Sequence, residues 1–152
     1  MSLKAGDRAP EINVKDHLGN IRSNKNLDNP LVVYFYPKDD TPGCTAEACS
    51  FRDNYNLFKV LGAEVWGISG DSQVSHINFA ERNDLPFPLL IDEDNKLRKA
   101  FGVPNFMGLI PGRVTYIIDS QGTIRCIFNN LLNGPAHVES ALRALEEISK
   151  VE

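Results

Sequence analysis

The amino-acid sequence predicts an α/β fold in which helices flank a central mixed sheet and a short hairpin precedes it. An unbroken apolar run over residues 31–36 suits a central strand that is covered on both faces. Segments with helical periodicity alternate with such strands, and the chain then closes with a hairpin and a helix. With 152 residues, the chain is expected to form a single domain over residues 1–152.

The first half of the chain divides into four predicted elements. They are a hairpin over 11–24 with its turn at 18–20, a strand over 31–36, a helix from about 42–44 to 61, and a strand over 65–69. Pro37 ends the first long strand, and Gly62 is placed to stop the helix. Apolar residues recur along this helix at spacings of four, three, four and three, and therefore line one face: Cys44, Ala48, Phe51, Tyr55 and Phe58.

The second half continues the alternation. It predicts a helix from a cap at 71–72 to about 83, a strand over 87–91, a brief helix opening at 92–95 and ending near 102, an irregular loop, a hairpin of strands 114–119 and 123–128, and a last helix opened by Pro135. This order fits a thioredoxin-like fold. The loop before Cys44 then lies at the carboxyl end of a central strand, where ligands bind in open α/β sheets.

Composition excludes several classes of protein. The net charge of −4 argues against a nucleic-acid binder, which needs a basic face. No apolar run approaches the roughly 18 residues of a membrane span, and the first residues lack the apolar stretch of a secretory signal. Three cysteines are too few, and odd in number, for a disulfide framework. We therefore expect a cytoplasmic protein, with a processed organellar form left open.

Cys44 and Cys49 form the most informative pair, because they lie where a buried strand gives way to a helix. The helix N-terminus favours the thiolate, which is the reactive form. Five helical residues separate two Cα atoms by about 8.6 Å, whereas a disulfide needs roughly 4.4–6.8 Å. The pair can therefore bond only if the helix unwinds. Cys44 lies on the packed face and Cys49 nearer water; small core residues are the alternative explanation.

The residues around Cys44 favour chemistry over core filling. Pro37 can shield a pocket, and the Thr41 hydroxyl is close enough in sequence to hydrogen-bond a thiolate at position 44. Pro37, Thr41 and Cys44 reproduce the Pro-x-x-x-Thr-x-x-Cys motif of peroxiredoxins. With Cys49 five residues on, the chain resembles the peroxiredoxin Q group, also called bacterioferritin comigratory protein. Further similarities are at 6–10, 111–116 and 128–130.

This resemblance implies a thiol-dependent peroxidase acting on hydrogen peroxide and organic hydroperoxides. Cys44 is then the peroxidatic residue, which becomes a sulfenic acid, and Cys49 resolves it as an intramolecular disulfide. Thr41 orients the peroxide, Pro37 shields the thiol, and Arg113 stabilises the thiolate and the leaving oxygen. A thioredoxin-type reductant recycles the disulfide. No metal or other cofactor is implied, and an intrahelical pair leads us to expect a monomer.

Two other functions stay open on the sequence. One is a protein thiol–disulfide oxidoreductase, although such enzymes usually carry the shorter Cys-x-x-Cys spacing. The other is a non-enzymatic redox sensor that uses the same oxidation. Cys126 falls within an apolar strand and is expected to be a core residue, remote from Cys44. Glu47 is either a favourable helix-dipole contact or a residue that tunes the thiol.

Overall fold

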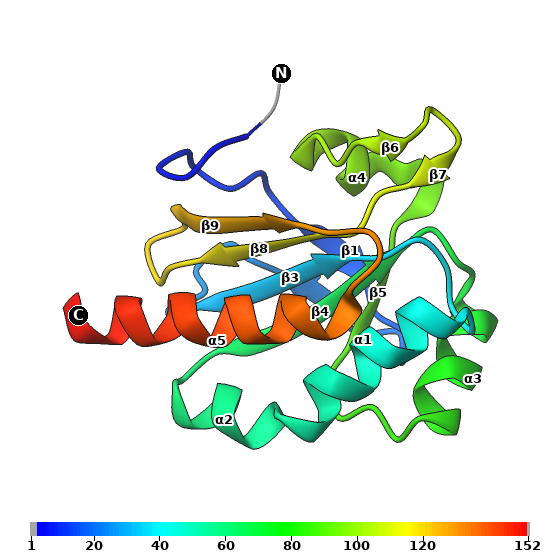
Figure 1. Cartoon of the computed structure of the whole chain (residues 1–152), viewed down its shortest axis with the longest axis horizontal. Coiled ribbons are helices and arrows are strands. Elements are labelled where there is room, and N and C mark those ends of the chain that lie inside the picture. The colour runs from blue at the N-terminus through cyan, green and yellow to red at the C-terminus, as the bar shows by residue number, and fades with distance from the viewer. Residues whose placement is uncertain (1–2, 152) are drawn as a thin grey trace.

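The computed structural model describes residues 3–151, and its centre is a five-stranded mixed sheet. The strand order is β5-β4-β3-β8-β9, formed by Leu89–Ile91, Glu64–Ser69, Leu31–Phe35, Val114–Ile118 and Ile124–Asn129. Strand β3 pairs in parallel with β4 and antiparallel with β8, so it occupies the centre (Figure 1). The predicted thioredoxin-like α/β architecture is confirmed, including the hairpin of β1 (Asn13–Lys15) and β2 (Ile21–Ser23) before the sheet.

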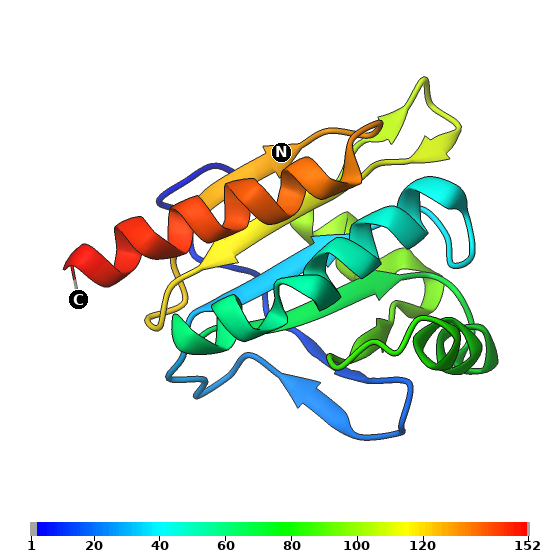
Figure 2. The same ribbon diagram turned by 60° about the horizontal axis from the view of Figure 1, so that its bottom comes forward.

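Side chains of β3 alternate between two cores on the two faces of the sheet. Val32 and Tyr34 point to the core beneath helices α1 (Pro42–Asp53) and α5 (Gly134–Val151), which cover the same face (Figure 2). Val33 and Phe35 point to the opposite core. Every residue of β3 is buried, which explains why its sequence is an unbroken apolar run.

The long helix expected up to Leu61 is in fact two helices, which corrects the sequence prediction. Helix α1 ends at Asp53, and α2 covers Tyr55–Val60. Between them Asn54 has φ −106° and ψ 10°, and its side-chain amide donates to the carbonyl of Ser50 at 2.8 Å. A side chain that bonds to the backbone four residues earlier competes with the helical ladder. The apolar spacing could not reveal this break because Phe58 keeps its place in the core.

The brief helix expected to open at 92–95 begins later. Glu93–Asn95 form a 3₁₀ turn, and the regular helix α4 covers Lys96–Phe101. The carboxylate of Asp92 accepts hydrogen bonds from the backbone amides of Leu97 and Arg98 and so caps this helix from several residues upstream. The predicted helix before it is confirmed as α3 (Gln73–Arg82), which Ser72 caps by accepting from the amide of Ser75.

The segment expected as an irregular loop contains a second small hairpin, formed by β6 (Asn105–Phe106) and β7 (Ile110–Pro111). Its turn covers residues 107–109, of which Met107 and Gly108 have positive φ angles. This hairpin lies beside the start of β8 in Figure 1, so it leads directly into Arg113. Within residues 3–151, no helix has the length and apolar character needed to cross a membrane.

Candidate active site

Cys44 lies in the first turn of α1, just beyond the carboxyl end of the central strand β3. Thr41 occupies the N-cap position with an extended backbone, and Pro42 is the first helical residue, where a missing N–H is tolerated. The Cys44 side chain packs with Ala48 and Phe51 against the sheet and is only 1% exposed. A thiol is thus buried at the positive end of a helix dipole.

Arg113, immediately before β8, brings a guanidinium to this thiol. Its Nη1 donates to Cys44 Sγ at 3.4 Å and to Glu47 Oε1 at 2.7 Å. Its Nε donates to the carbonyl of Leu131 at 2.9 Å, which fixes the orientation of the planar group. Burial lowers the pKa of Arg113, but the neighbouring Glu47 and Cys44 outweigh it, so the pKa of Arg113 lies above its usual value.

Glu47 is fully buried one helical turn after Cys44, so its role extends beyond a solvent-exposed dipole contact. Burial raises the pKa of Glu47 to about 8, although Arg113 opposes the shift. His137 of α5 approaches the second carboxylate oxygen, with Nδ1 3.5 Å from Glu47 Oε2. No residue pattern in the sequence points to His137, because its contact with Glu47 comes from the packing of α5 on α1.

The loop before α1 contains Pro37 and Thr41, the two residues predicted to shield the thiol and to orient the peroxide. The Thr41 hydroxyl donates to the carbonyl of Lys38 at 2.8 Å, so the hydrogen bond anticipated between Thr41 and the thiol is replaced by a bond within the loop. Pro37 is half-buried and lies two residues after the end of β3, following Tyr36. Arg98 donates to the carbonyls of Tyr36 and Gly112, at 2.8 and 2.9 Å, and thereby joins the segment before Pro37 to the segment before Arg113.

Cys49 lies on the same intact helix as Cys44, and both are free thiols. Cys49 is half-buried, and its Sγ is 3.6 Å from Oδ1 of Asn83, which follows α3. The Cys44 thiol is therefore more sheltered from solvent than the Cys49 thiol. Cys126 is a free thiol on β9, half-buried rather than fully within the core, with Sγ 3.9 Å from Ser140 Oγ.

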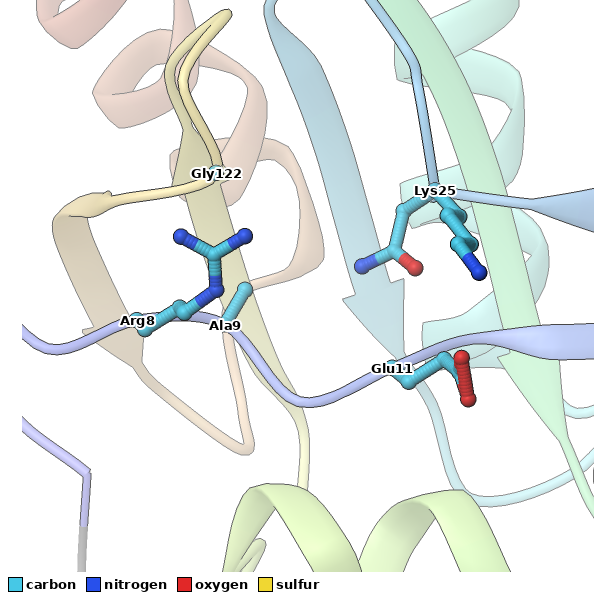
Figure 3. Close-up of a pocket in the computed structure, with 6 residues that line it drawn as sticks. Arg8, Ala9, Glu11, Lys25 and Gly122 are labelled. Carbon is cyan, nitrogen blue, oxygen red and sulfur yellow. The ribbon is translucent and has the colours of Figure 1, made fainter.

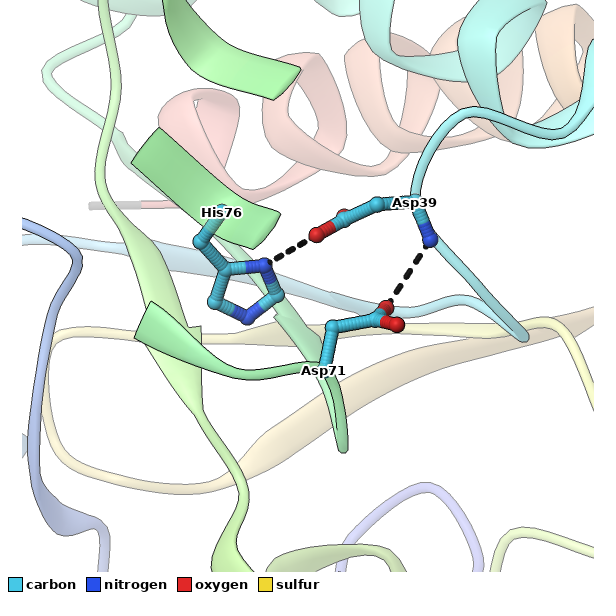
Figure 4. A group of neighbouring side chains, drawn as sticks. All are labelled: Asp39, Asp71 and His76. Carbon is cyan, nitrogen blue, oxygen red and sulfur yellow. Dashed lines mark hydrogen bonds and ion pairs between the residues drawn. The ribbon is translucent and has the colours of Figure 1, made fainter. Parts of the chain in front are cut away.

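A second polar cluster holds the loop before α1 against α3. Asp39 Oδ2 lies 2.7 Å from His76 Nδ1, within hydrogen-bond distance, and the backbone amide of Asp39 donates to Asp71 Oδ2 at 2.9 Å (Figure 4). The three side chains place potential ligand atoms within 4.8 Å of one another. However, Tyr36 and Ser75 also donate to the carboxylate of Asp39, and Ser69 donates to Asp71. We therefore regard this cluster as a structural tie for the loop.

The surface pocket in Figure 3 is separate from these groups. Its walls come from the N-terminal segment, the β2–β3 connection and the β8–β9 turn: Arg8, Ala9, Glu11, Asn24, Lys25 and Gly122. None of these residues contributes a reactive thiol or contacts Arg113. The chemistry of the molecule is therefore assigned to the Cys44 region.

A buried thiol beside an arginine at the start of a helix, on a thioredoxin-like sheet, is the arrangement of a thiol-dependent redox enzyme. The sequence profile of the AhpC/TSA family matches residues 5–127. Chloroplastic peroxiredoxin Q of Sedum lineare is 47% identical over 145 residues, which cover 94% of this chain and 78% of that protein. Chloroplastic peroxiredoxin Q of Arabidopsis thaliana is 47% identical over 146 residues, covering 95% of this chain and 68% of that protein.

Solved structures agree with the sequence comparison. The crystal structure of peroxidoxin BcpB from Mycobacterium tuberculosis superposes with a TM-score of 0.88 at 33% identity, over 96% of this chain and 98% of that one. Bacterioferritin comigratory protein of Xanthomonas campestris has a TM-score of 0.83 at 30% identity, over 91% and 92% of the two chains. The chain belongs to the AhpC/TSA family of peroxiredoxins, in its peroxiredoxin Q group, and is a thiol peroxidase. The resemblance found in the sequence is thereby confirmed.

Proposed function

We propose that Cys44 is the peroxidatic residue, and the contact of Arg113 Nη1 with Cys44 Sγ at 3.4 Å is the observation that carries this assignment. The thiolate sulfur attacks one peroxide oxygen, the O–O bond breaks, and Cys44 becomes a sulfenic acid. The other oxygen leaves with the bonding electron pair and takes up a proton as water or an alcohol. Arg113 is a fixed cation beside both the attacking sulfur and the charge that develops on the leaving oxygen.

We assign Thr41 and Pro37 to substrate positioning. Thr41 lies at the N-cap and its hydroxyl has a single hydrogen bond to the Lys38 carbonyl among the described contacts, so its oxygen can still accept from a peroxide. Pro37 lies two residues after the end of β3, at the start of the loop that leads to Thr41, and its role is to limit access of water to the thiol. Both roles are supported by their place between the strand and the first turn of α1.

Cys49 is proposed to attack the Cys44 sulfenic sulfur, which releases water and forms an intramolecular disulfide. The intact helix α1 holds the two Cα atoms about 8.6 Å apart, so the first turn has to unwind before the sulfurs meet. A thioredoxin-type reductant then attacks the disulfide by thiol exchange. Because both thiols belong to one helix, the cycle needs no second subunit, and we propose that the chain acts as a monomer.

Hydrogen peroxide and organic hydroperoxides are the proposed substrates. The bacterioferritin comigratory protein of Xanthomonas campestris has alkyl peroxide reduction activity. In this chain Leu132 is 91% exposed and directly follows the residue whose carbonyl holds Arg113, and Leu109 is 87% exposed in the hairpin that leads to Arg113. These side chains offer apolar surface to an alkyl group. The plant relatives are chloroplastic, which supports an organellar location as the alternative to a cytoplasmic one.

The proposal is tested by peroxide consumption with thioredoxin and thioredoxin reductase. Cys44→Ser is expected to abolish turnover, and Cys49→Ser to form the sulfenic acid once but recycle poorly. Cys126→Ser serves as the control and should retain turnover, because its thiol contacts Ser140 instead of the Arg113 cluster. Turnover by Cys44→Ser would contradict the assignment. Insulin reduction without peroxide consumption would instead favour the protein oxidoreductase alternative, and slow peroxide reaction without recycling would favour a redox sensor.

A further inference from the structure

Glu47 has one carboxylate oxygen bonded and one left without a donor. Oε1 accepts from Arg113 Nη1 at 2.7 Å, whereas Oε2 is buried and has no hydrogen-bond partner among residues 3–151. The polar groups around Glu47 come from several elements: Cys44 on α1 itself, Arg113 before β8, His137 on α5 and Tyr34 on β3. A buried carboxylate oxygen without a donor is costly, which calls for an explanation.

His137 cannot supply the missing donor in its neutral form. Its Nε2 faces the carbonyl of Asn130 at 2.8 Å and therefore carries a hydrogen. Its Nδ1 then has a lone pair, which accepts from the Thr115 hydroxyl at 2.7 Å. Burial lowers the pKa of His137 to about 4, so the ring is neutral near pH 7. An ionised Glu47 would direct an oxygen lone pair at a nitrogen lone pair, whereas a proton on Oε2 removes this repulsion.

Tyr34 adds no charge to the group of residues around Glu47. Burial, followed by the negative charges of Glu47 and Cys44, raises the pKa of Tyr34 well above its usual value, so it stays neutral. Arg113 is then the cation that contacts both acidic groups, through the same Nη1 atom. Two anions beside one cation in a buried site leave an uncompensated charge, and such coupled groups titrate as a pair.

We propose that Glu47 and Cys44 share one negative charge beside Arg113, so that Glu47 holds a proton on Oε2 when Cys44 is a thiolate. Glu47 is a positioning residue in this scheme, because it acts on Cys44 through Arg113. When Glu47 ionises, Arg113 is drawn to the carboxylate and its contact with the sulfur weakens. The proposal deepens the proposed function and depends on Cys44 being the reacting thiol.

The pH dependence of peroxide reduction provides the first test. Glu47→Gln is uncharged at all pH values, so its rate constant for peroxide reduction should lack the decline above about pH 8 that ionisation of Glu47 causes in wild type. Because Glu47 ionises with a pKa of about 8, the ratio of the variant's rate constant to that of wild type should rise roughly tenfold from about pH 7 to pH 9. Glu146→Gln, an exposed change on α5, should keep the ratio constant.

Infrared spectroscopy gives a second readout that does not require turnover or a fully active variant. The reduced wild-type protein should show a carboxylic-acid C=O stretching band at about pH 7 that is missing in Glu47→Gln. In Cys44→Ser, which lacks the competing thiolate, this band should disappear at a lower pH than in wild type. If the pH at which half of this band is lost is the same in Cys44→Ser and in wild type, the charge is not shared.

The outcomes separate this proposal from the assignment of Cys44. If Glu47→Gln loses activity by the same factor at every pH, or the wild-type carboxyl is ionised at about pH 7, the shared charge is overturned while the peroxidase function stands. If Cys44→Ser still reduces peroxide, the assignment of the reacting thiol fails first. A pH-dependent rate ratio together with the shifted infrared band supports the proposal.

Discussion

Gly134, at the start of α5, lies directly against Glu47 of α1. A Cβ atom at position 134 would come within 2.7 Å of Glu47 Cβ and 3.0 Å of the Gly43 carbonyl oxygen. Real Cβ atoms do not approach this closely, so the two helices meet here without a side chain between them. The same approach brings His137 of α5 towards Glu47 Oε2.

Gly134→Ala should therefore disturb both stability and the cluster around Cys44. Overpacking of this kind costs about 1–3 kcal/mol of unfolding free energy, which urea denaturation measures. We also expect a lower rate of peroxide reduction, because displacement of Glu47 moves Arg113. Gly70→Ala is the control: its added Cβ would meet the exposed Asn95 side chain, which can move aside. Equal effects of the two changes would contradict the close approach as the cause.

Arg113→Lys tests whether a positive charge alone suffices. A lysine ammonium is a point charge and cannot reproduce the planar group that bonds Cys44, Glu47 and Leu131 together. Loss of such an oriented donor typically lowers kcat by about 10²–10³, and steady-state kinetics with hydrogen peroxide measures it. Arg125→Lys on β9, whose Nη1 bonds Asp119, should leave the rate near wild type. A wild-type rate for Arg113→Lys would show that a positive charge suffices and that the planar guanidinium is not required.

Oxidation should increase hydrogen exchange in α1 while the sheet stays protected. The Cys44–Cys49 disulfide cannot form on a regular helix, so backbone bonds such as that from the Thr45 amide to the Thr41 carbonyl have to open. Exchange measured by mass spectrometry on reduced and disulfide forms checks this, with peptides from β3 as the internal reference. Cys49→Ser treated with peroxide should retain the protection of α1. Equal protection in the reduced and oxidised wild type would contradict the unwinding.

His137 should make the fold less stable in acid. Its pKa falls from 6.5 in the unfolded chain to about 4 in the folded one, because burial disfavours the charged ring. Between these values the unfolded state binds more protons, so stability falls as the pH falls from about 6.5 to 4. This contribution is roughly 3 kcal/mol at its full extent. Denaturation at several pH values should show a shallower acid dependence for His137→Asn than for wild type, and parallel curves would contradict this assignment.

Strong local signals explain what the sequence predicted correctly. The apolar run that forms β3 and the apolar stripe of α5 both depend on residues close in sequence. The break at Asn54 was missed because a side-chain hydrogen bond to Ser50 interrupts the helix without altering the apolar spacing. The β6–β7 hairpin was missed because its strands have two residues each, too short for a periodic pattern.

The active site likewise combines features that the sequence predicts with features that only the fold reveals. The motif points to Cys44, and the resemblance at 111–116 points to Arg113, but the contact between them joins positions 69 residues apart and requires the sheet to bring them together. The sequence places Glu47 at the helix start, while its burial and its neighbour His137 follow only from the crossing of α1 and α5. The loop hydrogen bond of Thr41 shows that proximity in sequence does not determine which acceptor a hydroxyl chooses.

The interruption at Asn54 also sets how far a disturbance at Cys44 can spread. The amides of Leu57 and Phe58 donate to the carbonyl of Asn54, so the second helix begins its own hydrogen-bond ladder there, and its link to α1 runs from Asn54 to Ser50, beyond both thiols. Phe58 can keep sealing the interior while the residues around the thiols rearrange. Opening around the thiols can then leave the part of the core around Phe58 closed, which limits the apolar surface through which partly opened proteins aggregate.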